Sequence, residues 1–243
     1  MRPCSCIPCA TPAGLGRRSF FATVASAATL ACVAPAMAQP AAAPAHTALS
    51  ADQALAALMD GNARFLAGQV PPGAPDPARR AMLAAGQAPY AAVLGCADSR
   101  AAPELLFHAG LGEIFVVRNA GNMADTAAIG SLEYAVAVLG VKLVMVLGHE
   151  RCGAASAAVS LARDDAALPG HLRDMLLPML PAALAALRAG GDLVDGTVKA
   201  NIRRVAARVV QQSPVIGPAV AAGQVKVVGA YYDLEEERVR LLA

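Results

Sequence analysis

The chain has little charge for its length and no large excess of either sign. Of its 243 residues, 16% are charged, and 20 Lys and Arg stand against 18 Asp and Glu. Residues 1–38 hold three of the arginines and no acidic residue, which leaves 17 basic and 18 acidic residues in the rest. This balance excludes a nucleic-acid-binding protein that depends on excess positive charge, and it excludes an acidic disordered tail.

Long uninterrupted apolar runs are also lacking, and the N-terminal run has the features of an export signal. Arg17 and Arg18 form a twin-arginine pattern, and an Ala-rich stretch over residues 20–33 follows. Ala36-Met37-Ala38 matches the small-x-small cleavage rule. We therefore expect residues 1–38 to be a twin-arginine signal peptide, cut between Ala38 and Gln39. The expected partner is the twin-arginine export machinery, and the expected location is the periplasm or outside the cell.

Two alternatives remain for this segment: an uncleaved membrane anchor, or a lipoprotein attached through Cys32. The run is diluted by Thr23, Ser26 and Thr29 and is stopped by Pro35, so it would partition weakly into a bilayer. We therefore expect no stable membrane insertion.

Cysteine becomes scarce once the signal peptide is removed. Four of the six cysteines precede residue 39, so the mature chain keeps Cys96 and Cys152. In an oxidising compartment two cysteines are by default interpreted as one disulfide. Two buried thiols, or a structural zinc site, are further alternatives.

The order of apolar runs predicts an α/β fold, with a mostly parallel central sheet flanked by helices. We expect residues 39–49 to form an Ala/Pro linker and residues 50–243 to form a single domain, since the sequence shows no internal repeat. Strands that alternate with helices favour a parallel sheet covered on both faces. A last strand over residues 239–242 is expected at an antiparallel edge. The other strands are expected at residues 90–95, 113–118, 142–148 and 224–230, and helices at residues 51–67, 103–108, 126–139, 153–163, 172–188 and 198–212.

Two polar clusters follow strands of this predicted sheet. Cys96-Ala97-Asp98-Ser99-Arg100 begins where the first strand ends, and His149-Glu150-Arg151-Cys152 begins where the third ends. Sites in open α/β sheets lie beyond the carboxyl ends of the strands, so the clusters can meet at one edge. Two thiolates and one imidazole suit tetrahedral zinc with one open position, and we expect one Zn²⁺ per chain.

Several ordered motifs resemble the β-class carbonic anhydrases. The resemblance covers residues 60–242 and rests on Asp60-Gly61-Asn62-Ala63-Arg64-Phe65, the two polar clusters, residues 112–122, and Gly130-Ser131-Leu132-Glu133-Tyr134-Ala135. It implies that Cys96, His149 and Cys152 are zinc ligands and that Asp98 and Arg100 form the active-site dyad. It also implies that Gln87, Phe115 and Tyr134 line a narrow pocket for carbon dioxide, and that the protein is a homodimer or homotetramer.

The residue types suit reversible hydration of carbon dioxide to bicarbonate and a proton. Zinc with an open position makes hydroxide available near neutral pH, and Asp98, held ionised by Arg100, can accept a proton from the attacking water. If Arg100 let go, Asp98 could become a fourth zinc ligand and close the site. Gly153 is expected to allow close approach of the backbone at a helix start, where the positive helix end favours bicarbonate.

Two other functions remain open from the sequence. Carbon disulfide or carbonyl sulfide could be hydrolysed on the same scaffold, because each is a similar linear electrophile. The chain could also be a zinc-binding module without turnover, although such a module has no need of the Asp98–Arg100 dyad. Some relatives carry a second, inhibitory bicarbonate site that includes Trp. The chain has no Trp and has Ala91 and Ala92 in that strand, so we expect no such regulation.

Overall fold

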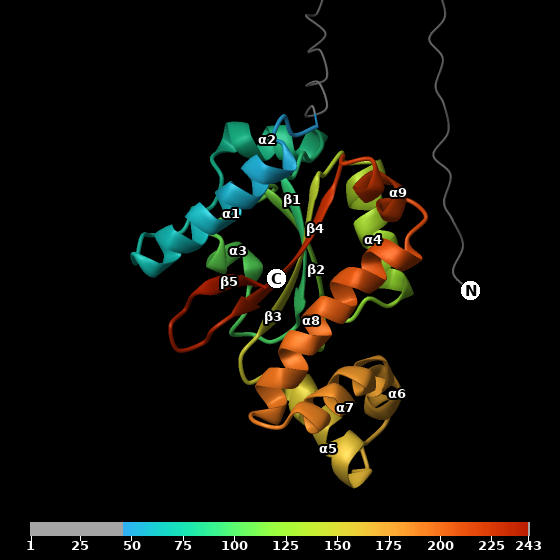
Figure 1. The fold of residues 1–243 in the computed structure, drawn as a ribbon. Coiled ribbons are helices and arrows are strands. Elements are labelled where there is room, and N and C mark those ends of the chain that lie inside the picture. The colour runs from blue at the N-terminus through green and yellow to red at the C-terminus, as the bar shows by residue number, and fades with distance from the viewer. Residues whose placement is uncertain (1–45, 243) are drawn as a thin grey trace, which may run out of the picture. The chain divides into compact units, whose positions relative to one another are not determined.

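The computed structural model describes residues 46–242, in which helices flank a central sheet (Figure 1). The predicted signal peptide, residues 1–38, and the first part of the predicted linker, residues 39–45, lie outside the described residues.

The sheet has five strands in the order β2-β1-β3-β4-β5. The first four are parallel, and β5 pairs antiparallel with β4 at one edge. This arrangement confirms the predicted α/β class with an antiparallel C-terminal edge strand. The strands are β1 (Ala91–Cys96), β2 (Ile114–Asn119), β3 (Leu143–His149), β4 (Lys226–Tyr232) and β5 (Val239–Leu242).

Both faces of the sheet are covered, which explains why its central strands are continuously apolar. Every residue of β1 and β3 is buried. Side chains of β1 alternate between two cores: Leu94 and Cys96 belong to one, and Ala91 and Val93 belong to the other. Cys96 therefore lies on the sheet face that carries the larger of the two cores.

Two groups of helices cover these faces (Figure 1). Residues of α1 and α3 contribute to the smaller core, and residues of α4, α5, α7 and α8 contribute to the larger one. No helix among residues 46–242 is both long enough and apolar enough to span a membrane. The helices are α1 (Ala51–Leu66), α2 (Pro77–Ala85), α3 (Pro103–Leu106), α4 (Thr126–Ala137), α5 (Gly153–Asp164), α6 (Leu172–Leu176), the 3₁₀ helix η1 (Leu177–Met179), α7 (Leu180–Ala189), α8 (Leu193–Gln212) and α9 (Ile216–Ala221).

The prediction of one continuous helix over residues 172–188 is wrong. The segment is divided into α6, η1 and α7, because Pro178 and Pro181 lack the amide hydrogens that a continuous helix needs. Each proline instead lies in the first turn of a new helix, where that hydrogen has no intrahelical partner.

Two short helices, α2 and α9, were not predicted from the sequence. The side chain of Asp76 accepts a hydrogen bond from the Arg79 amide at 2.8 Å, and Pro77 begins α2. Asp76 is therefore the N-cap of a helix that begins at the end of a stretch rich in Pro and Gly.

Helix α8 packs closely on β3 and β4 because glycines leave space for Ile202. A Cβ built on Gly148 would lie 2.6 Å from Ile202 Cδ1, and one on Gly229 would lie 2.7 Å from Ile202 Cγ2. Ile202 is fully buried between them. Gly148 directly precedes His149, so this contact sets the height of α8 above the end of β3.

We expect Gly148→Ala to destabilise the fold, because the added methyl group would overlap the Ile202 side chain. The free energy of unfolding should fall by about 1 to 3 kcal/mol, as for other overpacked cores. Urea denaturation followed by circular dichroism measures this change. Gly153→Ala is a matched control, because a Cβ there would meet no atom within 4 Å. Equal transition midpoints for the two variants would contradict the close packing.

Candidate metal centre

Cys96 is the last residue of β1 and is held against the loop that follows β2. It pairs with Asn119 in the sheet, and the next amide, of Ala97, donates to the Asn119 carbonyl at 3.0 Å. The amide of Gly121 donates to Cys96 Sγ at 3.3 Å. The sulfur is thus buried but has a backbone donor directed at it, an arrangement that favours the thiolate.

His149 is the last residue of β3, and its side chain is oriented by one hydrogen bond. Its Nδ1 lies 2.8 Å from the carbonyl oxygen of Glu150, so Nδ1 carries the hydrogen and donates. This tautomer leaves the lone pair on Nε2, the nitrogen that a metal would bind. Nε2 is buried and has no hydrogen-bond partner in the described part of the chain.

Cys152 returns to the same place because the backbone turns sharply between His149 and α5. Arg151 has a φ of 51°, in the left-handed region, and Cys152 is the N-cap residue of α5. Cys152 is 2% exposed. The thiol therefore lies at the start of a helix, where the positive end of the helix dipole stabilises negative charge.

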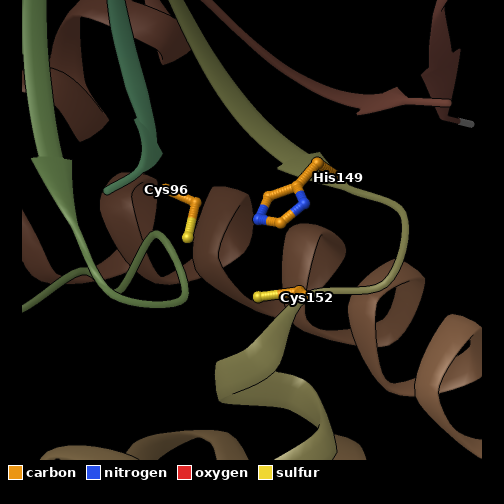
Figure 2. A group of neighbouring side chains, drawn as sticks. All are labelled: Cys96, His149 and Cys152. Atoms are coloured by element: carbon orange, nitrogen blue, oxygen red, sulfur yellow. The ribbon is translucent and has the colours of Figure 1, made fainter. Parts of the chain in front are cut away.

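The three predicted ligand side chains converge on one point. Sγ of Cys96, Sγ of Cys152 and a ring nitrogen of His149 all lie within 4.8 Å of one another. Figure 2 shows both sulfurs and the imidazole ring directed toward a shared space. Both cysteines are free thiols. Two soft sulfurs, one imidazole and an unpartnered buried nitrogen fit a tetrahedral metal ion with one position open to solvent or substrate.

The electrostatics of this cluster favour a bound cation. Hydrogen bonding to Cys152 lowers the pKa of Cys96, and the same bond raises the pKa of Cys152, since the two thiols share one proton. Burial lowers the pKa of His149, but the Cys96 thiolate, the Glu150 carbonyl and the Asp98 carboxylate together raise it by more, so the net shift is upward. A cation bound between the two sulfurs would stabilise the second thiolate as well.

Asp98 and Arg100 form a two-pronged ion pair beside the cluster. Arg100 Nε donates to Asp98 Oδ1 at 2.9 Å, and Nη2 donates to Oδ2 at 2.8 Å. Hydrogen bonding from the Arg100 side chain holds the pKa of Asp98 well below its usual range. Asp98 Oδ2 also lies 3.8 Å from His149 Nε2. An ionised carboxylate thus lies next to the space that the three ligands share.

Arg118, which received no individual role from the sequence, fastens the loop that carries Cys96 and Asp98. Its Nε donates to the Cys96 carbonyl at 2.8 Å, and its Nη2 donates to the Asp98 carbonyl at 2.7 Å. It is the one charged residue of β2, whose sequence is IFVVRN. In the sequence, a single arginine near the end of an apolar strand already indicates a role at the edge of the sheet. Only the structure shows which carbonyls it binds.

Asn201 and Glu150 support the site from outside and were also missed. Asn201 of α8 is buried, and its amide donates to the Gly121 carbonyl at 3.0 Å. The amide of Glu150 donates to the Tyr232 carbonyl, and Glu150 Oε2 accepts from the Leu234 amide. The loops that carry the ligands are therefore tied to α8 and to the turn between β4 and β5.

The predicted pocket residues lie together, but away from the three ligands of the same chain. Gln87 and Phe115 line an open cavity of about 510 Å³ beside the edge strand β2, and the rings of Phe115 and Tyr134 are 6.2 Å apart. Tyr134 is 46% exposed. Phe115 precedes Asn119, the sheet partner of Cys96, by four residues, which is about 13 Å along the strand. Within one chain these side chains form an open face.

Gly153 begins α5 directly after Cys152, as expected. A Cβ at this position would meet no other atom of the chain within 4 Å, so no close backbone approach requires glycine there.

Comparisons with known proteins agree with this arrangement. The sequence profile of the carbonic anhydrase family matches residues 91–239. Carbonic anhydrase 2 of Mycobacterium tuberculosis is 42% identical over 185 residues, which cover 76% of this chain and 89% of the relative. A carbonic anhydrase of Mycolicibacterium smegmatis is 45% identical over 186 residues, which cover 76% of this chain and 90% of the relative.

A solved structure with the same fold is described as one of two tetrameric β-carbonic anhydrases from Sordaria macrospora. Its TM-score against this chain is 0.63 at 30% sequence identity, and the match covers 69% of this chain and 87% of the other. On the matched profile, the sequence identities and the shared fold, the chain belongs to the β-class carbonic anhydrase family.

Proposed function

We propose that the protein hydrates carbon dioxide reversibly to bicarbonate and a proton, with one zinc ion held by Cys96, His149 and Cys152. The observation that carries this proposal is the convergence of the three ligand atoms within 4.8 Å of one another, beside the Asp98–Arg100 ion pair. A zinc ion with three protein ligands would supply a Lewis acid that brings the pKa of a coordinated water toward neutrality.

The residues of the chain have separate tasks in this reaction. The Nδ1 hydrogen bond of His149 to the Glu150 carbonyl keeps Nε2 free as a ligand. Arg100 holds both oxygens of Asp98, so that carboxylate stays ionised and keeps one orientation. Asp98 Oδ2, 3.8 Å from His149 Nε2, is placed to accept the hydrogen of the attacking water. Arg118 keeps the Cys96–Asp98 segment from shifting.

We also propose that a second copy of the chain completes the substrate pocket. The strand β2 is an edge of the sheet, and large apolar side chains beside it are exposed, among them Leu111 at 67% and Val138 at 52%. Gln87, Phe115 and Tyr134 lie on this open face, too far along β2 from Cys96 to line the site of their own chain. A symmetric contact between two such faces would bury these side chains, and we propose that each copy supplies them to its partner's metal centre.

Export is the third part of the proposal. The twin-arginine pattern at Arg17 and Arg18 and the Ala36-Met37-Ala38 cleavage rule support a signal peptide of residues 1–38. The mature protein, a linker followed by the catalytic domain from residue 50, would then act in the periplasm or outside the cell. Twin-arginine export carries folded proteins, so both cysteines could bind zinc before they reach an oxidising compartment.

Asp98→Asn should lower kcat/KM for carbon dioxide hydration by about 100-fold, since the amide cannot accept the proton as a carboxylate does. A stopped-flow assay with a pH indicator measures this loss, and elemental analysis should still find one zinc per chain. Asp164→Asn is the matched control, because Asp164 forms a similar two-pronged pair with Arg163 on the surface. Cys152→Ser should instead lose the zinc. Unchanged hydration in Asp98→Asn would remove Asp98 from the mechanism.

Val138→Asp should convert the assembly to smaller species and lower hydration activity, because a charge on the face beside β2 opposes the symmetric contact. Sedimentation velocity measures the change in mass. Leu172→Asp on α6 is the control, since Leu172 is comparably exposed, at 43%, and lies on a different helix. A monomeric Val138→Asp variant with full activity would show that no partner side chains are needed.

The mature protein should begin at Gln39, because cleavage is expected after Ala38. N-terminal sequencing of protein recovered from the periplasmic fraction tests this expectation. Replacement of Arg17 and Arg18 by lysine should retain the full-length chain inside the cell. Equal export of the two forms would exclude the twin-arginine route.

A further inference from the structure

A polar pocket lies beside the metal loops and has no part in the proposed reaction. Its volume is about 330 Å³, which is within the range of small-molecule sites. It lies between the C-terminal half of α8, the loop after β2 and the 3₁₀ helix η1. The lining residues are Met123, Ala124, Pro178, Asn201, Arg204, Val205, Ala207, Arg208, Gln211 and Gln212.

The charge in this pocket is entirely positive. Arg204 and Arg208 are one helical turn apart on α8, and no acidic residue lines the pocket. Within residues 46–242 neither arginine forms an ion pair with a carboxylate. Arg208 Nε donates to Gln212 Oε1 at 2.9 Å, which orients this guanidinium. Two guanidinium groups and two nearby glutamine amides offer many hydrogen-bond donors with no anionic acceptor.

The pocket is connected to the metal centre by two hydrogen bonds. Asn201 lines the pocket, is 2% exposed and donates to the Gly121 carbonyl at 3.0 Å. The amide of the same Gly121 donates to Cys96 Sγ at 3.3 Å. Met123 and Ala124, on the wall of the pocket, belong to the same loop. A ligand that moves this wall therefore acts on a backbone donor of the Cys96 sulfur.

We propose that Arg204 and Arg208 form a binding site for a small multivalent oxyanion, and that its occupancy is transmitted to Cys96 through Asn201 and Gly121. The ligand class has two or more negatively charged oxygens, as in sulfate, phosphate or a dicarboxylate. The planar fork of a guanidinium binds pairs of such oxygens, and two forks one turn apart favour a dianion over a monovalent ion. This site is separate from the Asp98–Arg100 dyad.

Calorimetric titration of the zinc-loaded protein with sulfate, at constant ionic strength set by chloride, tests the binding site. The double variant Arg204→Gln/Arg208→Gln should bind sulfate at least about tenfold more weakly, because two charge-assisted contacts are lost. The double variant Arg80→Gln/Arg238→Gln removes the same charge at two positions that do not line this pocket, and it should bind sulfate as the parent does. Equal weakening in both variants, or no weakening in the first, would overturn the site.

The connection to the metal centre has its own readout, which does not depend on catalysis. In the same titration followed by nitrogen–proton NMR, the amide signals of Ala124 and Gly121 should shift with one common dissociation constant. At a sulfate concentration equal to the parental dissociation constant, both shifts should be absent in Arg204→Gln/Arg208→Gln. A shift of Ala124 without Gly121 would overturn the transmission. Neither the sulfate affinity nor the amide shifts depend on carbon dioxide hydration. A protein that fails to hydrate carbon dioxide would therefore contradict the proposed function without contradicting the oxyanion site.

Discussion

The convergence of Cys96, His149 and Cys152 depends on the parallel pairing of β1 with β3. In that register Gly95 lies opposite Leu147, so both strands end at the same edge of the sheet, and Cys96 and His149 lie close together there. An antiparallel pair would place the carboxyl ends of the two strands at opposite edges. The turn at Arg151 then adds Cys152 from the start of α5. A candidate metal site built from segments more than fifty residues apart thus requires only two neighbouring strand ends and one tight turn.

Each of the three candidate ligand side chains is held by a contact within the chain itself. Gly121 donates to the Cys96 sulfur, the Glu150 carbonyl orients the His149 ring, and a helix start places Cys152. Arg118 fixes the carbonyls on either side of Ala97. Side chains held in this way would lose little conformational entropy if an ion bound between them.

The sequence predicted the strands, and it predicted that Cys96, His149 and Cys152 come together beside the Asp98–Arg100 pair, because these features depend on local patterns. Continuous apolar runs indicate buried strands, and Cys96, His149 and Cys152 follow those runs directly. Contacts between distant segments could not be predicted in this way. The bonds of Arg118 and Asn201 depend on which carbonyls the fold brings near them. Pro178 and Pro181 signal the break in the helix predicted over residues 172–188, but the regular spacing of apolar residues favoured one continuous helix. Among the described residues, no segment of the same chain covers the face that carries Phe115 and Tyr134, so its role could not be read from one sequence.

The position of Ile202 has an evolutionary consequence. Its side chain fills space that exists only because residues 148 and 229, on two adjacent strands, have no side chains. Replacement at any one of these three positions alters what the other two can accept. Across related sequences the three sites should therefore vary together, with a smaller residue on the helix wherever either strand position has gained a methyl group.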